Sequence, residues 1–392
     1  LQEKSSHPVD FPATVASFQE TALKASENRI RILKENGVAI VKGLGTLVGK
    51  DQIRVVSDHA DDVIKCDRIV LATGSHPKPN AIIPFNGTCV FPLDDFSLLP
   101  GIPESLLVVG GSQIGLELAV LFNRLGAKVF LVEEQPRLIP DQDPEMIEAL
   151  EQSFKKQKIK TLLNKKIIST FMDASKIDIT LDGGVKFSVE KMVMVGERQG
   201  NTPEAVTPGL GIELGKDQEV WVNEEMETSL KGVYAAGSVT GHKPCPDVSE
   251  VEGKVAGGNA AGASKALDRD QIPFRVLTTP EMASVGCLAS EAHHKGFRAV
   301  EGRADLSSLD HSLIHGEAEG FFKIVADRES KKIIGAQFLG PRASELLAPV
   351  LLAMKKGNPV SALTQISPGW GAGTEGVQEA ARACVRAGSG QR

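Results

Sequence analysis

The segment 108–133 contains the residues whose types and spacing most clearly suggest chemistry. Gly110 permits a tight turn after a predicted strand, and Gly115 lets the following helix pack closely on that strand. The N-terminus of such a helix offers free N–H groups and a positive dipole end to a pyrophosphate. Gly111 continues the turn, while Ser112 stands at the middle-glycine position, where its Cβ narrows the approach and its hydroxyl can donate to a phosphate. The pattern predicts a dinucleotide site.

Glu133 supplies the second half of this pattern. It ends the next predicted strand, about 20 residues beyond the turn, where an acid accepts hydrogen bonds from ribose hydroxyls. A carboxylate at this position repels the 2′-phosphate of NADP. We therefore expect NAD(H) as the ligand.

The composition excludes several classes of protein. A chain of 392 residues predicts two or three domains, and 41% hydrophobic with 24% charged residues is typical of a folded globular protein. The net charge of -6 comes from interspersed charges of both signs, which argues against a nucleic acid or an anionic membrane as partner. Polar residues and glycines interrupt the most apolar stretch, 106–122, so we expect no membrane span.

The cysteines indicate neither a disulfide framework nor a metal site. They are widely scattered, odd in number and without Cys-x-x-Cys spacing: Cys66, Cys89, Cys245, Cys287 and Cys384. We expect no bound metal and a reducing soluble compartment, either cytoplasm or an organelle matrix. Because Leu1 is not Met and no signal peptide follows, we also expect a processed chain or a piece of a longer one.

The periodicity of apolar residues predicts the elements that position these groups. A helix is predicted over 11–34, short β-branched strands over 38–41, 45–48 and 53–56, and a buried strand over 68–72. A proline-rich boundary follows, and strands and helices then alternate from 105 to 195, which indicates a doubly wound unit. From residue 272 onward the pattern is that of an α+β domain.

Three predicted strands end alike, at Gly74, Gly196 and Gly237. Glycine at such a position lets a ligand or another backbone approach closely. Taken singly, each strand is better explained as an ordinary buried strand followed by a turn.

Nearly the whole chain resembles the dihydrolipoamide dehydrogenases, which belong to the flavin-dependent pyridine nucleotide-disulfide oxidoreductase family. The matching segments are IVLATGS (69–75), GGSQIGLE (110–117), VE (132–133) with RLIP (137–140), GER (196–198) with NT (201–202), GVYAAG (232–237), TPE (279–281) with ASVG (283–286), and GFFK (320–323) with IG (334–335). The resemblance implies an α/β protein with two doubly wound nucleotide-binding domains, the first incomplete and split, and a C-terminal α+β dimerisation domain. The implied boundaries are 1–100 with 221–265 for the FAD-type domain, 101–220 for the NAD-binding domain and 266–392 for the dimerisation domain.

The resemblance also implies roles for individual residues. The expected cofactor-binding set is Gly110, Gly111, Ser112, Gly115, Glu117, Glu133 and Gly196 for NAD(H), with Thr73, Gly74, Gly237 and Ser238 on the FAD side. Glu117 lies near the nicotinamide in the family, but an ion pair with a neighbour such as Arg124 is an equally good interpretation.

Four features of the family have no counterpart in this sequence. The chain contains neither the N-terminal glycine turn for FAD nor a Cys-x-x-x-x-Cys pair. Ser238 stands where the family has an aspartate that binds the FAD ribityl chain. The family's C-terminal His base is also absent, since residues 367–375 contain no histidine. Glu375 in this segment matches the acid that pairs with the base in the family. Trp370 is a candidate either to fill the space of the missing histidine or to pack at a dimer interface.

From these departures we expect an NAD(H)-binding structural or regulatory subunit without catalytic residues of its own. The alternative is part of an active FAD-dependent dihydrolipoamide dehydrogenase whose N-terminal part is missing or supplied by another chain. Another redox activity and a purely architectural role without nucleotide also stay open. NAD(H) is the expected cofactor, and FAD binding is left open because its main ligands are missing. The expected partner is a second copy of this chain or a homologous chain. The resulting pair could also be part of a larger complex.

Overall fold

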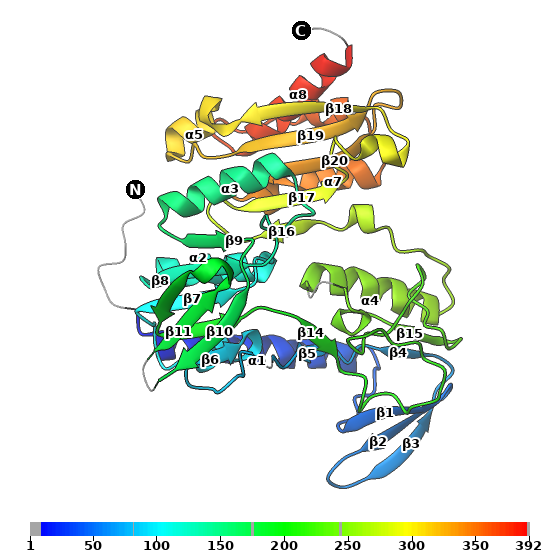
Figure 1. Cartoon of the computed structure of the whole chain (residues 1–392). Helices are drawn as coiled ribbons and strands as arrows, with labels where there is room; N and C mark the ends of the chain where they lie inside the picture. The colour runs from blue at the N-terminus through cyan, green and yellow to red at the C-terminus, as the bar shows by residue number, and fades with distance from the viewer. Residues whose placement is uncertain (1–8, 81, 174–175, 243–244, 390–392) are drawn as a thin grey trace.

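The computed structural model describes residues 9–80, 82–173, 176–242 and 245–389. Leu1, on which the expectation of processing rests, lies outside these residues. Figure 1 shows a C-terminal sheet domain stacked above a central nucleotide-binding domain, with a smaller sheet and helix unit beside the latter and an antiparallel β-sheet projecting below.

A five-stranded parallel sheet forms the centre of the second domain, in the order β6-β13-β7-β8-β9. Its strands are β6 (Val90–Pro92), β7 (Ser105–Val109), β8 (Lys128–Glu133), β9 (Lys160–Leu163) and β13 (Lys191–Met194). Alternate residues of a strand point to opposite faces. Leu106 and Val108 accordingly join the core under two helices, α2 (Gln113–Arg124) and α3 (Pro144–Lys156), whereas Leu107 faces the opposite cluster.

The opposite face of this sheet packs on three antiparallel strands. These are β10 (Ile167–Met172), β11 (Ile177–Leu181) and β12 (Lys186–Val189). Both faces of the parallel sheet are therefore covered, as such sheets require.

The smaller unit is built from segments on either side of the central domain. β4 (Ile69–Leu71) pairs in parallel with β15 (Val233–Ala235), and α4 (Pro246–Ala260) packs on both. Among the described residues β15 is the one strand that pairs with β4. The projecting sheet consists of β1 (Leu44–Gly49), β2 (Gln52–Val56) and β3 (Asp61–Lys65).

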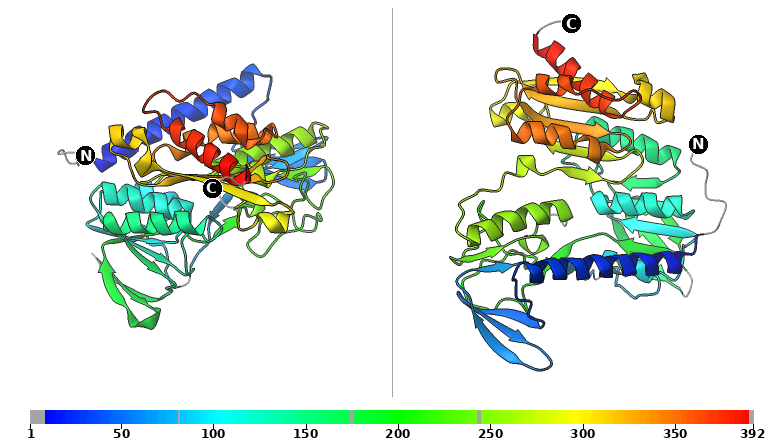
Figure 2. Two further views of the ribbon diagram at one scale, coloured as in Figure 1. Left: turned by 90° about the horizontal axis from the view of Figure 1, so that it is seen from above. Right: turned by 180° about the vertical axis from the view of Figure 1, so that it is seen from behind.

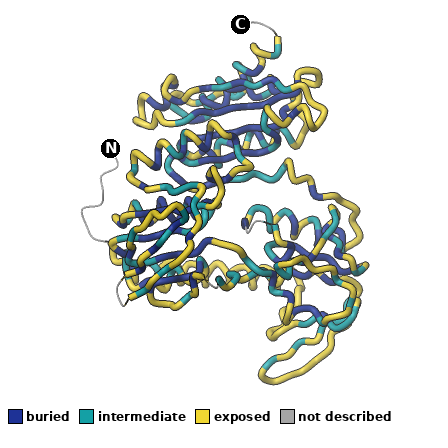
Figure 3. The backbone as a smooth tube through the Cα atoms, in the orientation of Figure 1, coloured by how far each residue is buried: buried dark blue, intermediate teal, exposed yellow. Residues whose placement is uncertain are grey.

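The long helix α1 (Phe11–Glu35) runs behind the central domain and the smaller unit (Figure 2). Phe11 alone of its residues is buried, where it contacts Phe122 of α2. Figure 3 shows that most of α1 and of the sheet β1–β3 is exposed. The helix begins where the Asp10 carboxylate accepts the N–H of Ala13, with a proline in its first turn.

A short antiparallel ribbon joins the central domain to the smaller unit. It pairs β5 (Ser75–Pro77) with β14 (Arg198–Gly200), so the chain's two crossings between these units lie side by side. Arg198 fixes the ribbon, because its guanidinium donates to the Ser75 carbonyl at 2.6 Å and to the Asp94 carboxylate at 2.7 Å.

The C-terminal domain is an antiparallel sheet in the order β16-β17-β20-β19-β18. Its strands and helices are β16 (Phe274–Val276), β17 (Met282–Gly286), β18 (Ala299–Asp305), α5 (Asp310–His315), β19 (Phe321–Asp327), β20 (Ile333–Leu339), α6 (Ala343–Leu346), α7 (Ala348–Lys355) and α8 (Thr374–Ser389). The central strands β19 and β20 are buried along their whole length. α8 lies directly on β18, where a Cβ on Gly302 would come within 2.1 Å of the Cys384 nitrogen.

The predicted fold class is confirmed, with nucleotide-binding sheets followed by a separate C-terminal α+β domain. The exact domain boundaries stay a prediction. One predicted strand is wrong: residues 38–41 lie in irregular structure, and Val38, Ile40 and Val41 are each at least 40% exposed. In the described ranges no helix is long and apolar enough to span a membrane.

Candidate functional site

A cleft of about 860 Å³ opens at the carboxyl ends of the parallel strands. One wall comes from the β7–α2 turn, the end of β8 and the loop after β13, and the other from the β5–β14 ribbon and residues 238–242. Ligands of open α/β sheets bind at this edge. The cleft is thus placed for a ligand that contacts both units.

The glycine turn has the geometry that a pyrophosphate needs. Gly110 has φ of +116°, and a Cβ there would lie 2.8 Å from the Val195 carbonyl oxygen. A Cβ on Gly115 would lie 1.9 Å from the Gly110 oxygen, so only glycine permits this contact between α2 and β7. Ser112 is the N-cap of α2, yet its side chain makes no capping hydrogen bond, and the residue lines the cleft. The first turn of α2 therefore faces the cleft beside a serine hydroxyl.

The Glu133 carboxylate is held by two backbone groups. Its Oε2 accepts the N–H of Gly111 at 2.6 Å, and its Oε1 accepts the N–H of Gln135 at 2.7 Å. The remaining lone pairs of a carboxylate can accept hydroxyl hydrogens. The structure thus brings Gly110, Ser112 and Glu133 together on one wall of the cleft.

Glu117 lies apart from the residues that line the cleft. Its Oε1 accepts the N–H of Leu277 at 2.9 Å, directly after β16 of the C-terminal domain. Arg124, the ion-pair partner suggested by sequence, instead donates to the Thr279 hydroxyl. In this structure Glu117 connects α2 to the C-terminal domain, and its role near the nicotinamide stays a prediction.

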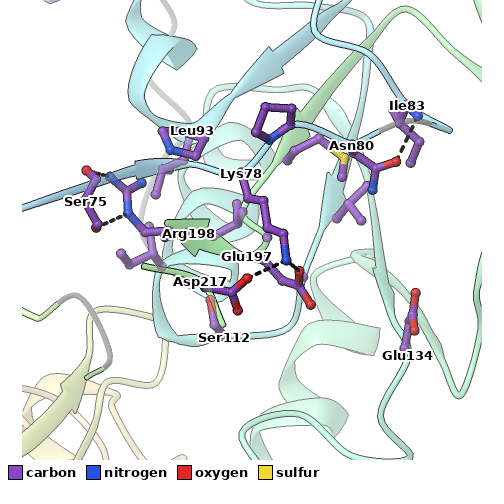
Figure 4. Close-up of a pocket in the computed structure, with 18 of the residues that line it drawn as sticks. Ser75, Lys78, Asn80, Ile83, Leu93, Ser112, Glu134, Glu197, Arg198 and Asp217 are labelled. Atoms are coloured by element: carbon purple, nitrogen blue, oxygen red, sulfur yellow. Dashed lines mark hydrogen bonds and ion pairs between the residues drawn. The ribbon is translucent and has the colours of Figure 1, made fainter. Parts of the chain in front are cut away.

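An ion-pair cluster that the sequence analysis missed stands on the ribbon side of the cleft (Figure 4). The Lys78 ammonium donates to Asp217 at 2.6 Å and to Glu197 at 3.0 Å. These hydrogen bonds raise the pKa of Lys78, and the same contact lowers the pKa of Asp217. Gly196, which precedes Glu197, lines the cleft, and a Cβ there would meet nothing within 4 Å.

Two glycine turns of the smaller unit, at Gly74 and Gly237, lie next to each other. Gly74 has φ of +75°, and a Cβ on it would lie 3.8 Å from the Ser238 hydroxyl. Asn201 holds this turn, since its side-chain amide donates to the Thr73 carbonyl at 2.8 Å. Ser238 lines the cleft. The preceding residue, Gly237, has φ of +79°.

A buried acid stands behind the second of these turns. Glu252 is fully buried, its Oε2 accepts the Gly237 N–H at 2.8 Å, and its Oε1 lies 2.7 Å from His242 Nδ1. Arg269 can only donate, so the 2.8 Å contact makes His242 Nε2 an acceptor and places the ring hydrogen on Nδ1, whose hydrogen-bond partner is the Thr240 hydroxyl at 2.7 Å. The Gly237 N–H is therefore already satisfied within the protein.

The two implied cofactors fit the described residues to different degrees. For NAD(H) they provide a glycine turn, a helix N-terminus, an acid at the ribose position and an open cleft, which together form a fitting site. For FAD they provide one wall, around Gly74 and Ser238, and a neutral hydroxyl in place of a carboxylate. That wall does not by itself fit the whole flavin dinucleotide.

The C-terminal segment presents a tryptophan where the resemblance implies a base. Trp370 is 84% exposed. Glu375 accepts the backbone N–H of His311 at 3.3 Å, and the His311 ring is buried, with Nδ1 2.8 Å from the Gly371 carbonyl oxygen. No histidine ring is thus paired with Glu375 in the part of the chain that the structure describes. The same residues contain no cluster of His, Cys, Asp and Glu suited to a metal.

Two family models match the chain. Residues 3–266 match the model described as pyridine nucleotide-disulphide oxidoreductase, and residues 272–367 match its dimerisation domain. These matches together cover both nucleotide-binding-type units and most of the C-terminal domain.

Three known proteins are similar to this chain in sequence or structure. A dihydrolipoyl dehydrogenase of Thermus scotoductus is 32% identical over 357 residues, which are 90% of this chain and 76% of that protein. A mitochondrial dihydrolipoyl dehydrogenase of Arabidopsis thaliana is 30% identical over 97% of this chain and 76% of its own length. The crystal structure of LpdA from Mycobacterium tuberculosis superposes with a TM-score of 0.88 at 25% identity, covering 96% of this chain and 84% of LpdA.

Proposed function

Because the chain belongs to the pyridine nucleotide-disulphide oxidoreductase family and is dihydrolipoamide dehydrogenase-like, we propose that it binds NAD(H) in the cleft beside Gly110 and Glu133. The observation that carries the proposal is the hydrogen bond from the Gly111 N–H to Glu133. This bond orients the carboxylate at the carboxyl end of β8, where ribose hydroxyls are bound in dinucleotide folds. The N-terminus of α2 then stabilises the pyrophosphate.

We further propose that this chain acts as a structural or regulatory subunit. Two departures from the family pattern support this role. Ser238, within the matched residues 3–266, stands where the resemblance implies a charged flavin ligand, and Trp370, three positions beyond the matched residues 272–367, lies in the segment where the resemblance implies a base. A hydroxyl cannot supply the charge of a carboxylate, and an indole cannot accept a proton from a dithiol.

A second candidate function is supported by the edge of β4. This strand pairs only with β15 among the described residues, and Val70 is 39% exposed. A parallel sheet of two strands is marginal alone, and an open edge has unpaired N–H and C=O groups. The alternative is therefore an active FAD-dependent dihydrolipoamide dehydrogenase whose remaining strands come from residues outside this sequence. In the family, FAD and NAD serve as cofactors.

Three measurements on the purified chain separate these functions. Calorimetric titration with NADH and NADPH should show binding of NADH and much weaker binding of NADPH. Absence of NADH binding would refute the proposed site. The visible absorption spectrum should lack a flavin band, and turnover of dihydrolipoamide with NAD should be undetectable. A flavin band accompanied by turnover would instead establish the FAD-dependent enzyme.

A further inference from the structure

The ribbon side of the cleft has more carboxylates than cations. Glu197, Asp217 and Glu219 all line it. The Lys78 ammonium donates to Asp217 at 2.6 Å and to Glu197 at 3.0 Å, and we define these three residues as the Lys78 cluster. Glu219 lies beside the cluster, because its Oε2 accepts the backbone N–H of Asp217 at 2.8 Å. This wall therefore combines three carboxylates with one ammonium group that pairs with two of them.

The other charged groups of this wall do not offset that excess. The Arg198 guanidinium is paired with Asp94, which does not itself line the cleft, at 2.7 Å. The His242 ring is neutral, since its Nε2 accepts a hydrogen bond from Arg269. Behind the ring, Glu252 is fully buried and its Oε1 accepts no hydrogen bond, with the Arg269 guanidinium 3.8 Å away. Among the described residues, the wall thus keeps a net negative charge.

The charges of the Lys78 cluster persist at neutral pH. Hydrogen bonds to Asp217 and Glu197 raise the pKa of Lys78, and the bond to Lys78 lowers the pKa of Asp217. The Lys78 side chain is 37% exposed and that of Asp217 is 20% exposed. Charges that are partly buried are screened less by salt than charges in open solvent.

The sheet topology places this wall at one end of a bound dinucleotide. β7 lies between β8 and β13 in the parallel sheet. A pyrophosphate at the turn after β7, with the adenosine ribose at Glu133 after β8, leaves the other half of the dinucleotide over the end of β13. The residues that line the cleft there are Val195, Gly196 and Glu197. The nicotinamide half therefore lies on the side of the Lys78 cluster.

We propose, on the basis of the NAD(H) site above, that the Lys78 cluster makes this site prefer the oxidised nucleotide, NAD⁺, over NADH. The oxidised nicotinamide ring has a positive charge that the reduced ring lacks, and the two nucleotides share every other charged group. A wall with net negative charge therefore stabilises the oxidised ring more. Glu197 and Asp217 strengthen the preference, whereas Lys78 limits it.

Isothermal titration of the full chain with NAD⁺ and with NADH tests this preference. Wild type should bind NAD⁺ about five times more tightly than NADH, the effect of about one net charge at an intermediate dielectric constant. Glu197→Gln should reduce that ratio to about two or less, and Lys78→Met should raise it to about ten or more. The double variant Glu197→Gln with Asp217→Asn leaves the ammonium unpaired, so it should bind NADH more tightly than NAD⁺.

The ratio of affinities separates this role from a structural one. A cluster that only holds the wall in place would weaken both nucleotides alike when it is broken, without changes of opposite direction. The matched control is Glu134→Gln, an acid that lines the same cleft beside Glu133 and lies apart from the Lys78 cluster (Figure 4). This variant should change both affinities by a similar factor and leave their ratio at the wild-type value.

Ionic strength gives an independent readout. In about 1 M salt, where the Debye length is about 3 Å, the wild-type ratio should fall toward one. Equal affinities for NAD⁺ and NADH in low salt, or a ratio that is the same in wild type, Glu197→Gln and Lys78→Met, would overturn this inference and leave the NAD(H) site intact. If neither nucleotide binds to wild type, both the proposed site and this inference are refuted.

Discussion

The Gly111 N–H and the Glu133 carboxylate are joined by a hydrogen bond of 2.6 Å, between the glycine turn and the end of the neighbouring strand. The bond exists because β7 and β8 are adjacent and parallel, with Val109 paired to Val132. A carboxylate fixed in this way needs no reorganisation to meet two ribose hydroxyls. Its negative charge also repels a 2′-phosphate. The same side chain should therefore affect both the affinity for NADH and the preference for NADH over NADPH.

Replacement of Glu133 by alanine should weaken NADH binding by about 10- to 100-fold, since hydrogen bonds to a charged group contribute about 1.5 to 3 kcal/mol. The preference for NADH over NADPH should narrow in the same variant, because the repelling charge is gone and Lys165 and Lys166 line the same cleft. Isothermal titration with each nucleotide measures both effects.

The matched control for this variant is Glu148→Ala. Glu148 is an exposed acid on α3 and does not line the cleft. NADH affinity should change little in it. Equal losses in the two variants would mean that net charge, and not the Glu133 contact, determines affinity.

Gly115→Ala should destabilise the central domain by about 2 to 4 kcal/mol, because the new methyl would have to displace the Gly110 carbonyl from a distance of 1.9 Å. Gly253→Ala is the control, since it lies within α4 and its Cβ would meet nothing within 4 Å. It should stabilise slightly, by about 0.5 to 1 kcal/mol. Urea denaturation gives both values, and a neutral Gly115→Ala would contradict the close packing of α2 on β7.

The local pattern was sufficient to predict the glycine turn and Glu133. Strand, turn, helix and acid are contiguous in the sequence, and each position has a conformational or chemical requirement that few residue types meet. The prediction of a strand over 38–41 was wrong. β-branched residues favour a strand only where a neighbouring strand pairs with their segment. Val41 is 60% exposed, without such a neighbour in the described structure.

Contacts between distant segments could not be predicted in this way. The Glu117 carboxylate meets the Leu277 backbone, 160 positions away, and Lys78 meets Asp217, 139 positions away. Nothing in the residues near Glu117 or Lys78 specifies those partners. Their positions follow from how the units pack, which requires the folded structure.

Lys323→Met should destabilise the chain by about 3 kcal/mol, since removing one side of a buried ion pair leaves the other uncompensated. Lys323 is 5% exposed, and its ammonium lies 2.6 Å from Glu145 and 3.1 Å from Asp143, at the junction of the central and C-terminal domains. Burial lowers the pKa of Lys323, but the surrounding carboxylates outweigh burial and the net pKa is raised. Denaturation of this variant and of the exposed Lys186→Met measures the difference, and equal stabilities would refute the role of the cluster.

Asp327→Asn should remove a stability increment that depends on pH. Hydrogen bonds from the Ser330 backbone N–H and hydroxyl, aided by the Arg298 N–H, lower the pKa of Asp327 to about 2. An acid whose pKa falls on folding stabilises the folded state above its unfolded pKa, near 3.9, and loses that contribution as the pH falls toward the folded value.

The free energies of unfolding of wild type and Asp327→Asn should therefore differ most above about pH 4 and converge toward about pH 2. Urea denaturation across this range measures the gap, with Asp58→Asn, at an exposed turn, as the control. A gap that stays constant between the two pH limits would mean that Asp327 stabilises the β19–β20 turn through hydrogen bonds that its protonated form also makes. A gap that closes identifies the carboxylate charge as the stabilising group.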